Sequence, residues 1–356
     1  MYQEKNIKIM EPSGPKLREI HKYLKTIDKN GIYTNFGPLH DQLIFEFSKY
    51  FKINQNKIVL LSNATLALIG AIATTPNMYK VWQVPSWTFT ATPSAIVAAG
   101  RSPRFVDVDK QWRAKFSSKN HNWVDVLPFG DEMRISYDKK PNDFLIIDGA
   151  ASFDALKNIN FGNLSSTAII LSLHATKLMS AGEGGVFITN DELWAKRLRS
   201  WSSFGFDSKN RVSSSLGINA KFSEYNAAVG LASFYKWEIN RNKIRHLTER
   251  VNEISNKYSF DVAPAMRKGL ATPYWIVHLK TKAEKVRLVK QFQLLGIETR
   301  DWWAAGCKQM PAFNRFTTES LVNTKKLSET TIGLPFHLKL TNADLNRIDN
   351  AISFTD

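Results

Sequence analysis

The stretch AIILSLHATKLMSAGEGGVFITN, residues 168–190, decides the fold. It begins with a short apolar run, Ala168–Leu171, that is typical of a buried strand, and Val186–Thr189 is a second such run. Between them lie a polar loop ending at Lys177 and a glycine-rich turn at 182–185. A lysine just past a buried strand can lose its charge by desolvation, and the neutral amine forms Schiff bases with carbonyls. Because a lone lysine is more often a solvated surface residue, the neighbouring motifs must decide.

Strands and helices alternate on both sides of this stretch. The strand candidates are Lys57–Leu61, Val81–Pro85, Pro103–Asp109 and Phe144–Asp148. This alternation predicts an α/β fold with a mostly parallel sheet.

The pattern changes after one long predicted helix, Leu231–Asn256. The elements that follow favour an α+β arrangement, with strands at Tyr274–Leu279 and Ile297–Arg300, a helix at Lys282–Leu295 and a last helix ending at Phe354. We therefore predict a large domain, residues 1–235, and a small C-terminal domain, residues 236–356.

Three further features point to a ligand site, although each also has an ordinary structural explanation. A helix opening at Ser62–Leu68 offers free N–H groups and a positive dipole end to a phosphate, but it also reads as an N-capped structural helix. Asp148 ends a buried strand at the sheet edge where α/β proteins bind ligands, but it could cap a helix or pair with a cation. Phe89 follows a strand, where aromatic residues usually pack in the core.

The run SLHATK followed by GEGG resembles the pyridoxal-phosphate-dependent nucleotide-sugar aminotransferases of the DegT/DnrJ/EryC1/StrS family. Segments similar to the family's TNxGP, PSxTFxAT, GxNxRMSExQAA and LPxH motifs follow in the family's order, between Thr34 and about His337. The resemblance implies fold type I, the aspartate-aminotransferase type. That fold has a mostly parallel, seven-stranded-type sheet in the large domain and a smaller α+β C-terminal domain.

The resemblance also implies roles for residues. Lys177 would carry the cofactor covalently and Asp148 would face its ring nitrogen, which makes these two the catalytic candidates. The cofactor-binding residues would be Ala64, Thr65, Phe89, Asp148, Ser172, Lys177 and, from the other subunit, Asn219. The substrate-binding residues would be Tyr33, Phe36, Lys221, Trp302 and Trp303. For Trp302 and Trp303, core packing is an equally good explanation.

The chain departs from the family pattern at several positions. Ala64 replaces the usual glycine, and it serves as well if the backbone needs no positive φ there. Ala151 replaces the usual glutamine or histidine, and the segment 127–130 lacks the family's histidine. Lys221 replaces an arginine, which matters if a bidentate phosphate contact is needed.

The function implied by the resemblance is transamination with pyridoxal 5'-phosphate, with pyridoxamine 5'-phosphate as intermediate. The amino donor would be L-glutamate. The acceptor would be a nucleotide-linked keto-6-deoxy sugar, with dTDP-4-keto-6-deoxyglucose aminated at C-4 favoured over a 3-keto isomer. The product would serve bacterial surface polysaccharide or glycan biosynthesis, and the enzyme would be a homodimer with shared active sites. The family's C-3 dehydratase branch has histidine at the lysine position, so Lys177 argues against it.

Composition sets further limits. The net charge of +16 over 356 residues favours an anionic partner, such as nucleic acid, a membrane surface or a phosphorylated small molecule. The basic run Asn240–His246 lacks a nucleic-acid motif, so we expect neither nucleic-acid nor membrane binding.

We expect no metal site. One cysteine, Cys307, and no apolar signal or membrane-spanning run favour a cytoplasmic protein. A basic nucleic-acid-binding protein and a non-catalytic pyridoxal-phosphate fold remain the alternatives.

Overall fold

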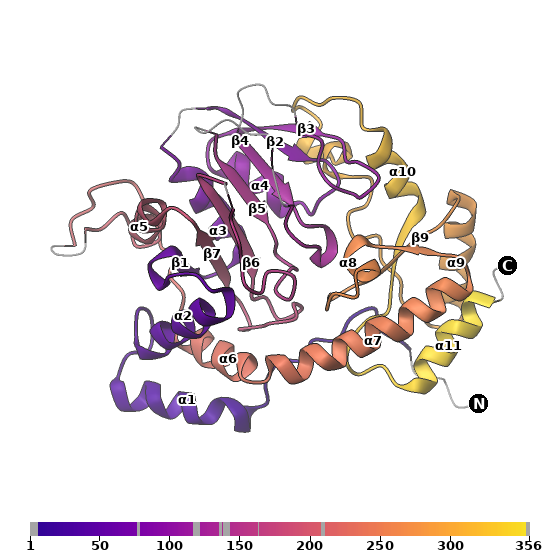
Figure 1. The fold of residues 1–356 in the computed structure, drawn as a ribbon, viewed down its shortest axis with the longest axis horizontal. Helices are drawn as coiled ribbons and strands as arrows, with labels where there is room; N and C mark the ends of the chain where they lie inside the picture. The colour runs from indigo at the N-terminus through magenta and orange to yellow at the C-terminus, as the bar shows by residue number, and fades with distance from the viewer. Residues whose placement is uncertain are drawn as a thin grey trace.

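The computed structural model describes residues 6–76, 79–116, 122–134, 137, 143–162, 164–207 and 211–353. These residues form a seven-stranded sheet covered by helices and a separate three-stranded sheet with helices of its own (Figure 1).

The large sheet has the strand order β1-β7-β6-β5-β4-β2-β3. Its strands are β1 (Ile58–Leu61), β2 (Val81–Pro85), β3 (Ser102–Val106), β4 (Asn122–Val126), β5 (Leu145–Asp148), β6 (Thr167–Ser172) and β7 (Gly185–Thr189). The pairs β2–β3, β2–β4, β4–β5 and β5–β6 are parallel, and β7 runs antiparallel to both β6 and β1. The prediction of a mostly parallel sheet is therefore confirmed. The exception, β7, follows β6 through a loop that folds back on itself, because the N–H groups of Leu173 and Ala175 donate to the carbonyls of Gly184 and Gly182.

Both faces of this sheet are buried, with successive side chains directed to opposite sides. In β1, Ile58 and Leu60 belong to the apolar core on one face, and Val59 and Leu61 belong to the core on the other. The second face is covered by α3 (Ala64–Ala73), α4 (Ala91–Ala98) and α5 (Glu192–Trp201), and the first by α2 (Pro38–Phe51) and α6 (Glu224–Phe234). The remaining N-terminal helix, α1 (Leu17–Asn30), packs on α6.

The predicted single helix over Leu231–Asn256 is wrong, because α6 ends at Phe234 and α7 (Trp237–Lys257) begins three residues later. At the break, the N–H of Lys236 donates to the carbonyl of Ser233, three residues back instead of four. The indole of Trp237 is buried and donates to the hydroxyl of Tyr50, which anchors the start of α7 in the core. The tertiary packing of Trp237 therefore determines where α6 ends and α7 begins.

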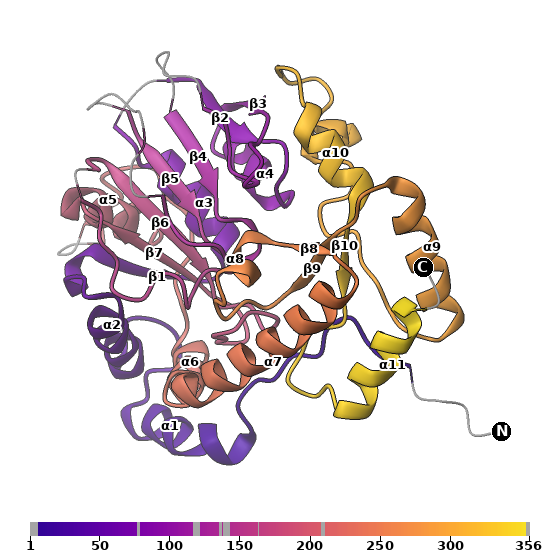
Figure 2. The same ribbon diagram turned by 45° about the vertical axis from the view of Figure 1, so that its right-hand side comes forward.

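The small sheet is antiparallel, in the order β10-β9-β8, and α7 runs toward it from α6 (Figure 2). Its strands are β8 (Asp261–Val262), β9 (Trp275–His278) and β10 (Thr331–Leu334), and the helices near it are α8 (Pro264–Arg267), α9 (Lys282–Leu294), α10 (Val322–Thr330) and α11 (Asn342–Ser353). The remaining short helices are η1 (Gln55–Lys57), η2 (Pro128–Gly130), η3 (Cys307–Gln309) and η4 (Pro311–Phe313).

The segment Ile297–Arg300 is not a strand, because Ile297 bridges to Ile7 while Arg300 bridges to Gly333, and a strand needs a continuous ladder to one neighbour. The expected helix end at Phe354 lies outside the described residues. The division into domains at residue 235 stays a prediction.

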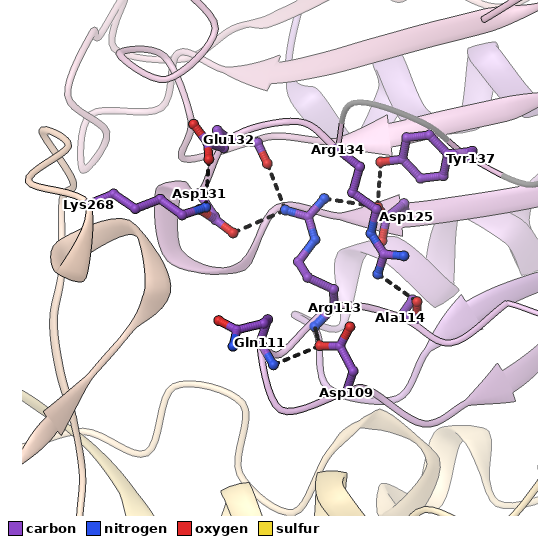
Figure 3. Close-up of polar contacts among 10 residues, drawn as sticks. All are labelled: Asp109, Gln111, Arg113, Ala114, Asp125, Asp131, Glu132, Arg134, Tyr137 and Lys268. Carbon is purple, nitrogen blue, oxygen red and sulfur yellow. Dashed lines mark hydrogen bonds and ion pairs between the residues drawn. The ribbon is translucent and has the colours of Figure 1, made fainter.

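A buried ion cluster around Arg113 joins the two parts of the chain (Figure 3). The guanidinium lies 3.2 Å from Asp125 on β4 and 3.1 Å from Asp131, which follows η2. Lys268, at the end of α8, lies 2.8 Å from the other oxygen of Asp131. Burial alone would lower the pKa of Arg113, but the negative charge of Asp125 and its neighbours raises it above the ordinary value. Arg113 therefore stays charged and balances two buried carboxylates.

Replacing Arg113 by methionine should destabilise the protein by about 3–5 kcal/mol, because two buried carboxylates would lose the buried cation they share. Urea denaturation measures this loss. The matched control is Arg134→Met: Arg134 lies 3.8 Å from Asp125 with 30% of its side chain exposed, and its loss should cost less than about 1 kcal/mol. Equal losses in the two variants would contradict the assignment.

Candidate active site

A cavity of about 590 Å³ lies where β5 and β6 end. Because neighbouring parallel strands end at the same edge of a sheet, the residues that close them meet there. Of the residues singled out from the sequence, those that line the cavity are Ala64, Thr65, Phe89, Asp148, Ser172, Lys177, Trp302 and Trp303. Tyr33, Phe36, Asn219 and Lys221 are not among its described lining residues.

One end of the cavity has the features of an anion site. Asn63 caps α3 by accepting a hydrogen bond from the N–H of Leu66, and Ala64 and Thr65 are the first residues of the helix. Ser172 is paired in the sheet with Gly185, and a Cβ on Gly185 would lie 2.4 Å from the carbonyl oxygen of Asn63. Only glycine allows this close approach, which brings the end of β6 against the helix N-terminus. The helix dipole, free N–H groups and a hydroxyl therefore face the same space, as a phosphate requires.

Ala64 has no positive φ, so it adopts the backbone conformation of this turn without strain. Its own N–H remains available. The substitution of alanine for the family's glycine therefore leaves the anion site intact.

Asp148 lies on the cavity wall with only 7% of its surface exposed. One carboxylate oxygen accepts a hydrogen bond from the hydroxyl of Thr92 at 2.7 Å, and the other accepts from the N–H of Ala150 at 3.1 Å. Burial raises the pKa of Asp148, and these hydrogen bonds and the charge of Lys177 offset only part of that effect. A buried carboxylate of this kind is stabilised by a cationic ligand, such as a protonated ring nitrogen.

Lys177 lies in the loop between β6 and β7, which backbone hydrogen bonds hold closed from Leu173 to Gly184 and from Ala175 to Gly182. Its amine donates to the hydroxyl of Tyr274 at 2.6 Å. Gly182 has φ +79°, the left-handed conformation that glycine adopts without strain. The loop therefore fixes the backbone of the lysine and leaves its amine inside the cavity.

Aromatic side chains form another wall. Trp303 is 8% exposed and stacks on Phe129, with ring centroids 4.0 Å apart, so it is mainly a packing residue that borders the cavity. Trp302 is only partly buried. Phe89 is 56% exposed, so its ring is available to a ligand and is not part of the core.

The segments around Tyr33 and Phe36 are tied to the start of α6. The buried carboxylate of Glu224 accepts hydrogen bonds from the N–H groups of Leu39 and His40 at the start of α2. Tyr33 and Phe36 remain about half exposed on the surface. Within this one chain they lie apart from the described cavity lining, so their assignment to the substrate site stays a prediction.

Asn219 and Lys221 also lie away from the described cavity lining. The amine of Lys221 donates to the side-chain oxygen of Asn219 at 2.7 Å, and it lies 4.6 Å from the ring centroid of Phe204. Both belong to the segment before α6, which has several exposed apolar side chains. The roles of Asn219 at the cofactor and of Lys221 at the substrate therefore stay predictions.

Some residues at the cavity had no role assigned from the sequence: Phe129, His174, Glu183 and Tyr274 line it, and Thr92 lies behind it, bonded to Asp148. His174 contacts residues close to it in sequence: the N–H of Thr176 donates to its Nδ1 at 3.2 Å, and its Nε2 lies 3.5 Å from Glu183. Thr92 lies four residues after Thr88 at the start of α4, and their hydroxyls are 3.0 Å apart. Tyr274 comes from the small sheet, and no local pattern pairs it with Lys177.

Within the described residues, no group of histidine, cysteine, aspartate and glutamate side chains is arranged to hold a metal ion. No helix in the described part of the chain is long and apolar enough to cross a membrane.

Comparison with known proteins gives the family. The profile of the DegT/DnrJ/EryC1/StrS aminotransferase family matches residues 16–117 and 139–353. The dTDP-4-amino-4,6-dideoxy-D-glucose transaminase of Shigella dysenteriae is 30% identical over 244 residues, and this match spans 64% of either chain. The Escherichia coli protein of the same name is 29% identical over 258 residues, 68% of either chain.

A solved structure agrees with the fold. A Bacillus cereus protein assigned to the PLP-dependent aminotransferases superposes with a TM-score of 0.85 at 25% identity, covering 98% of this chain and all of the other. The fold is therefore fold type I, as predicted. The anion site, the strand-end carboxylate and the cavity lysine fit pyridoxal phosphate, which is the family's cofactor. The chain belongs to the DegT/DnrJ/EryC1/StrS family of pyridoxal-phosphate-dependent aminotransferases.

Proposed function

We propose that the protein transfers the amino group of L-glutamate to C-4 of dTDP-4-keto-6-deoxyglucose, for bacterial surface polysaccharide or glycan biosynthesis. The observation that carries this proposal is the meeting of Lys177, Asp148 and the α3 anion site in one cavity. Two relatives named as dTDP-4-amino-4,6-dideoxy-D-glucose transaminases support the choice of sugar and of C-4.

Different residues of the cavity would bind the cofactor and carry out the proton transfers. Bound pyridoxal phosphate supplies a ring that withdraws electrons from the substrate carbon. The α3 N-terminus and the hydroxyl of Ser172 would hold its phosphate, and Asp148 would keep a proton on the ring nitrogen. Lys177 would hold the cofactor covalently, and its amine, once free, would move protons to and from the substrate carbon.

The rest of the cavity is suited to a sugar. Trp302 offers an aromatic surface to the apolar side of a deoxy sugar, and the carboxylate of Glu183 can accept hydrogen bonds from hydroxyl groups. The net charge of +16 raises the local concentration of a diphosphate substrate.

The test is a product assay. The protein is incubated with L-glutamate and either dTDP-4-keto-6-deoxyglucose or its 3-keto isomer, and products are identified by mass and NMR. We expect the 4-amino sugar. Amination of only the 3-keto isomer would refute the choice of C-4. Activity on a free amino-acid pair without amination of either sugar would refute the sugar assignment.

The active unit proposed is a homodimer with shared sites. Among the described residues that line the cavity, Lys177 is the only lysine or arginine, although a diphosphate needs cationic partners. Lys221 and Asn219 lie in the segment 204–221, whose exposed apolar residues Phe204, Val212, Leu216 and Ile218 would otherwise face water. A second copy covering this segment would bury the apolar residues and bring Asn219 to the cofactor phosphate.

Mixing of inactive variants tests this arrangement. Lys177→Ala and Asn219→Ala chains, unfolded and refolded together, should recover about one quarter of wild-type activity, because half of the random dimers are hybrids with one intact site of two. Either variant refolded alone is the control. A monomer with full activity in analytical ultracentrifugation would contradict the proposal.

We propose a cytoplasmic location without nucleic-acid or membrane partners. The single cysteine, Cys307, is buried and suits a reducing compartment. Salt-dependent retention on DNA would instead support the nucleic-acid alternative.

A further inference from the structure

Tyr274 and Lys177 meet in the cavity from different parts of the fold. Lys177 follows β6 of the large sheet, and Tyr274 immediately precedes β9 of the small sheet. The hydroxyl oxygen of Tyr274 lies 2.6 Å from the amine of Lys177, and both residues line the cavity. This distance is that of a strong hydrogen bond.

The position of the Tyr274 hydroxyl is fixed by packing. The ring is 9% exposed and contacts Trp302 edge-on, with centroids 4.8 Å apart, and Phe129 in the same way at 5.6 Å. Phe129 is itself held, because the hydroxyl of Thr272 donates to its carbonyl oxygen. The hydroxyl therefore has little freedom to move away from the lysine.

The chemistry of the two groups is complementary. An ammonium only donates hydrogen bonds, whereas a phenol hydroxyl both donates and accepts. When the amine is charged, one of its N–H groups donates to the tyrosine oxygen. When the amine is neutral, its lone pair accepts the hydroxyl proton. The contact thus persists in both states through which a reactive lysine must pass.

We propose that Tyr274 is the positioning residue for Lys177, holding its amine in the cavity in both protonation states. This inference rests on the proposed role of Lys177 as the cofactor-bearing residue. If the contact between Tyr274 and Lys177 only joined the two sheets, its loss would change stability alone. If Tyr274 positions the amine, the loss of the contact also changes the reactivity of the amine.

The first experiment uses the cofactor-free protein. Trace acetylation with acetic anhydride across a pH series, followed by mass spectrometry of the Lys177 peptide, measures the reactivity of this amine. Tyr274→Phe keeps the ring but removes the hydroxyl that holds the amine in place, so labelling of Lys177 at neutral pH should become roughly tenfold faster.

The matched control is Tyr258→Phe. Its hydroxyl donates to the carbonyl oxygen of Asp349 at 3.0 Å, and it lies outside the described cavity lining. This variant should leave Lys177 labelling and turnover at wild-type values. If Tyr274→Phe does not fold, 3-fluorotyrosine at position 274 keeps the shape but weakens the acceptor, and it should shift the labelling curve in the same direction by less.

The second experiment uses the loaded enzyme. Tyr274→Phe should lower kcat by about tenfold or more while the KM values for donor and acceptor change little, because the lost contact serves proton transfer and not binding. An unchanged labelling curve in the Tyr274 variants would overturn the inference, as would an equal shift in Tyr258→Phe. Failure of borohydride to fix the cofactor on Lys177 of the wild type would instead overturn the proposed function.

Discussion

Lys177→Ala is expected to abolish turnover, with a loss of at least about 10⁴-fold, because it removes the group that forms the covalent bond to the cofactor. The wild-type protein should be yellow, and borohydride should fix the cofactor on the peptide that contains Lys177. The variant should bind the cofactor without a covalent bond and lose the label. Absorbance spectra, peptide mass analysis and the amination assay measure these effects.

Lys177→Arg separates covalent chemistry from charge. Arginine retains a positive charge near Asp148 but cannot act as the nucleophilic amine, because its guanidinium stays protonated. We therefore expect the same loss of turnover as in Lys177→Ala. Substantial activity in Lys177→Arg would show that the charge of this residue, and not its nucleophilicity, is what matters.

Asp148→Asn should lower turnover by about a hundredfold or more, because a neutral amide cannot keep a proton on the ring nitrogen as a carboxylate does. The same change should stabilise the cofactor-free protein at neutral pH. Burial raises the pKa of Asp148 in the folded state, so the charged carboxylate costs stability once the pH exceeds the pKa of the unfolded chain. Near-normal activity would place the essential acid elsewhere.

A pH series on the cofactor-free protein tests the predicted effect of Asp148→Asn on stability. The advantage of Asp148→Asn should shrink as the pH falls below about 4, where the carboxyl group is protonated in both states. The control is Glu183→Gln, since Glu183 lines the same cavity with 58% of its side chain exposed, and a solvated carboxylate affects stability little. If the stability of Asp148→Asn equalled that of the wild type at every pH, the carboxylate would not be destabilised by burial.

The sequence by itself determined the strands that carry the site and much of the site's chemistry. Short apolar runs such as Ala168–Leu171 became fully buried strands, because a strand covered on both faces needs apolar side chains at every position. Asp148 and Ser172 close such strands, so the parallel arrangement was enough to place them in one cavity. The glycine turn before β7 could also be predicted from local sequence, since Gly182 adopts a positive φ of +79° that glycine reaches without strain.

Tertiary structure alone decided the contacts between elements far apart in the sequence. Tyr274 reaches Lys177 across 97 positions of sequence, and Glu224 caps the start of α2 across 185. The break between α6 and α7 and the division of Ile297–Arg300 between two partners follow from packing. Periodicity records which face of an element is buried but not which element covers it, so these contacts leave no local pattern to find. The roles predicted for Asn219 at the cofactor and for Lys221 at the substrate could not be placed from one chain, because the placement proposed for them depends on a second copy.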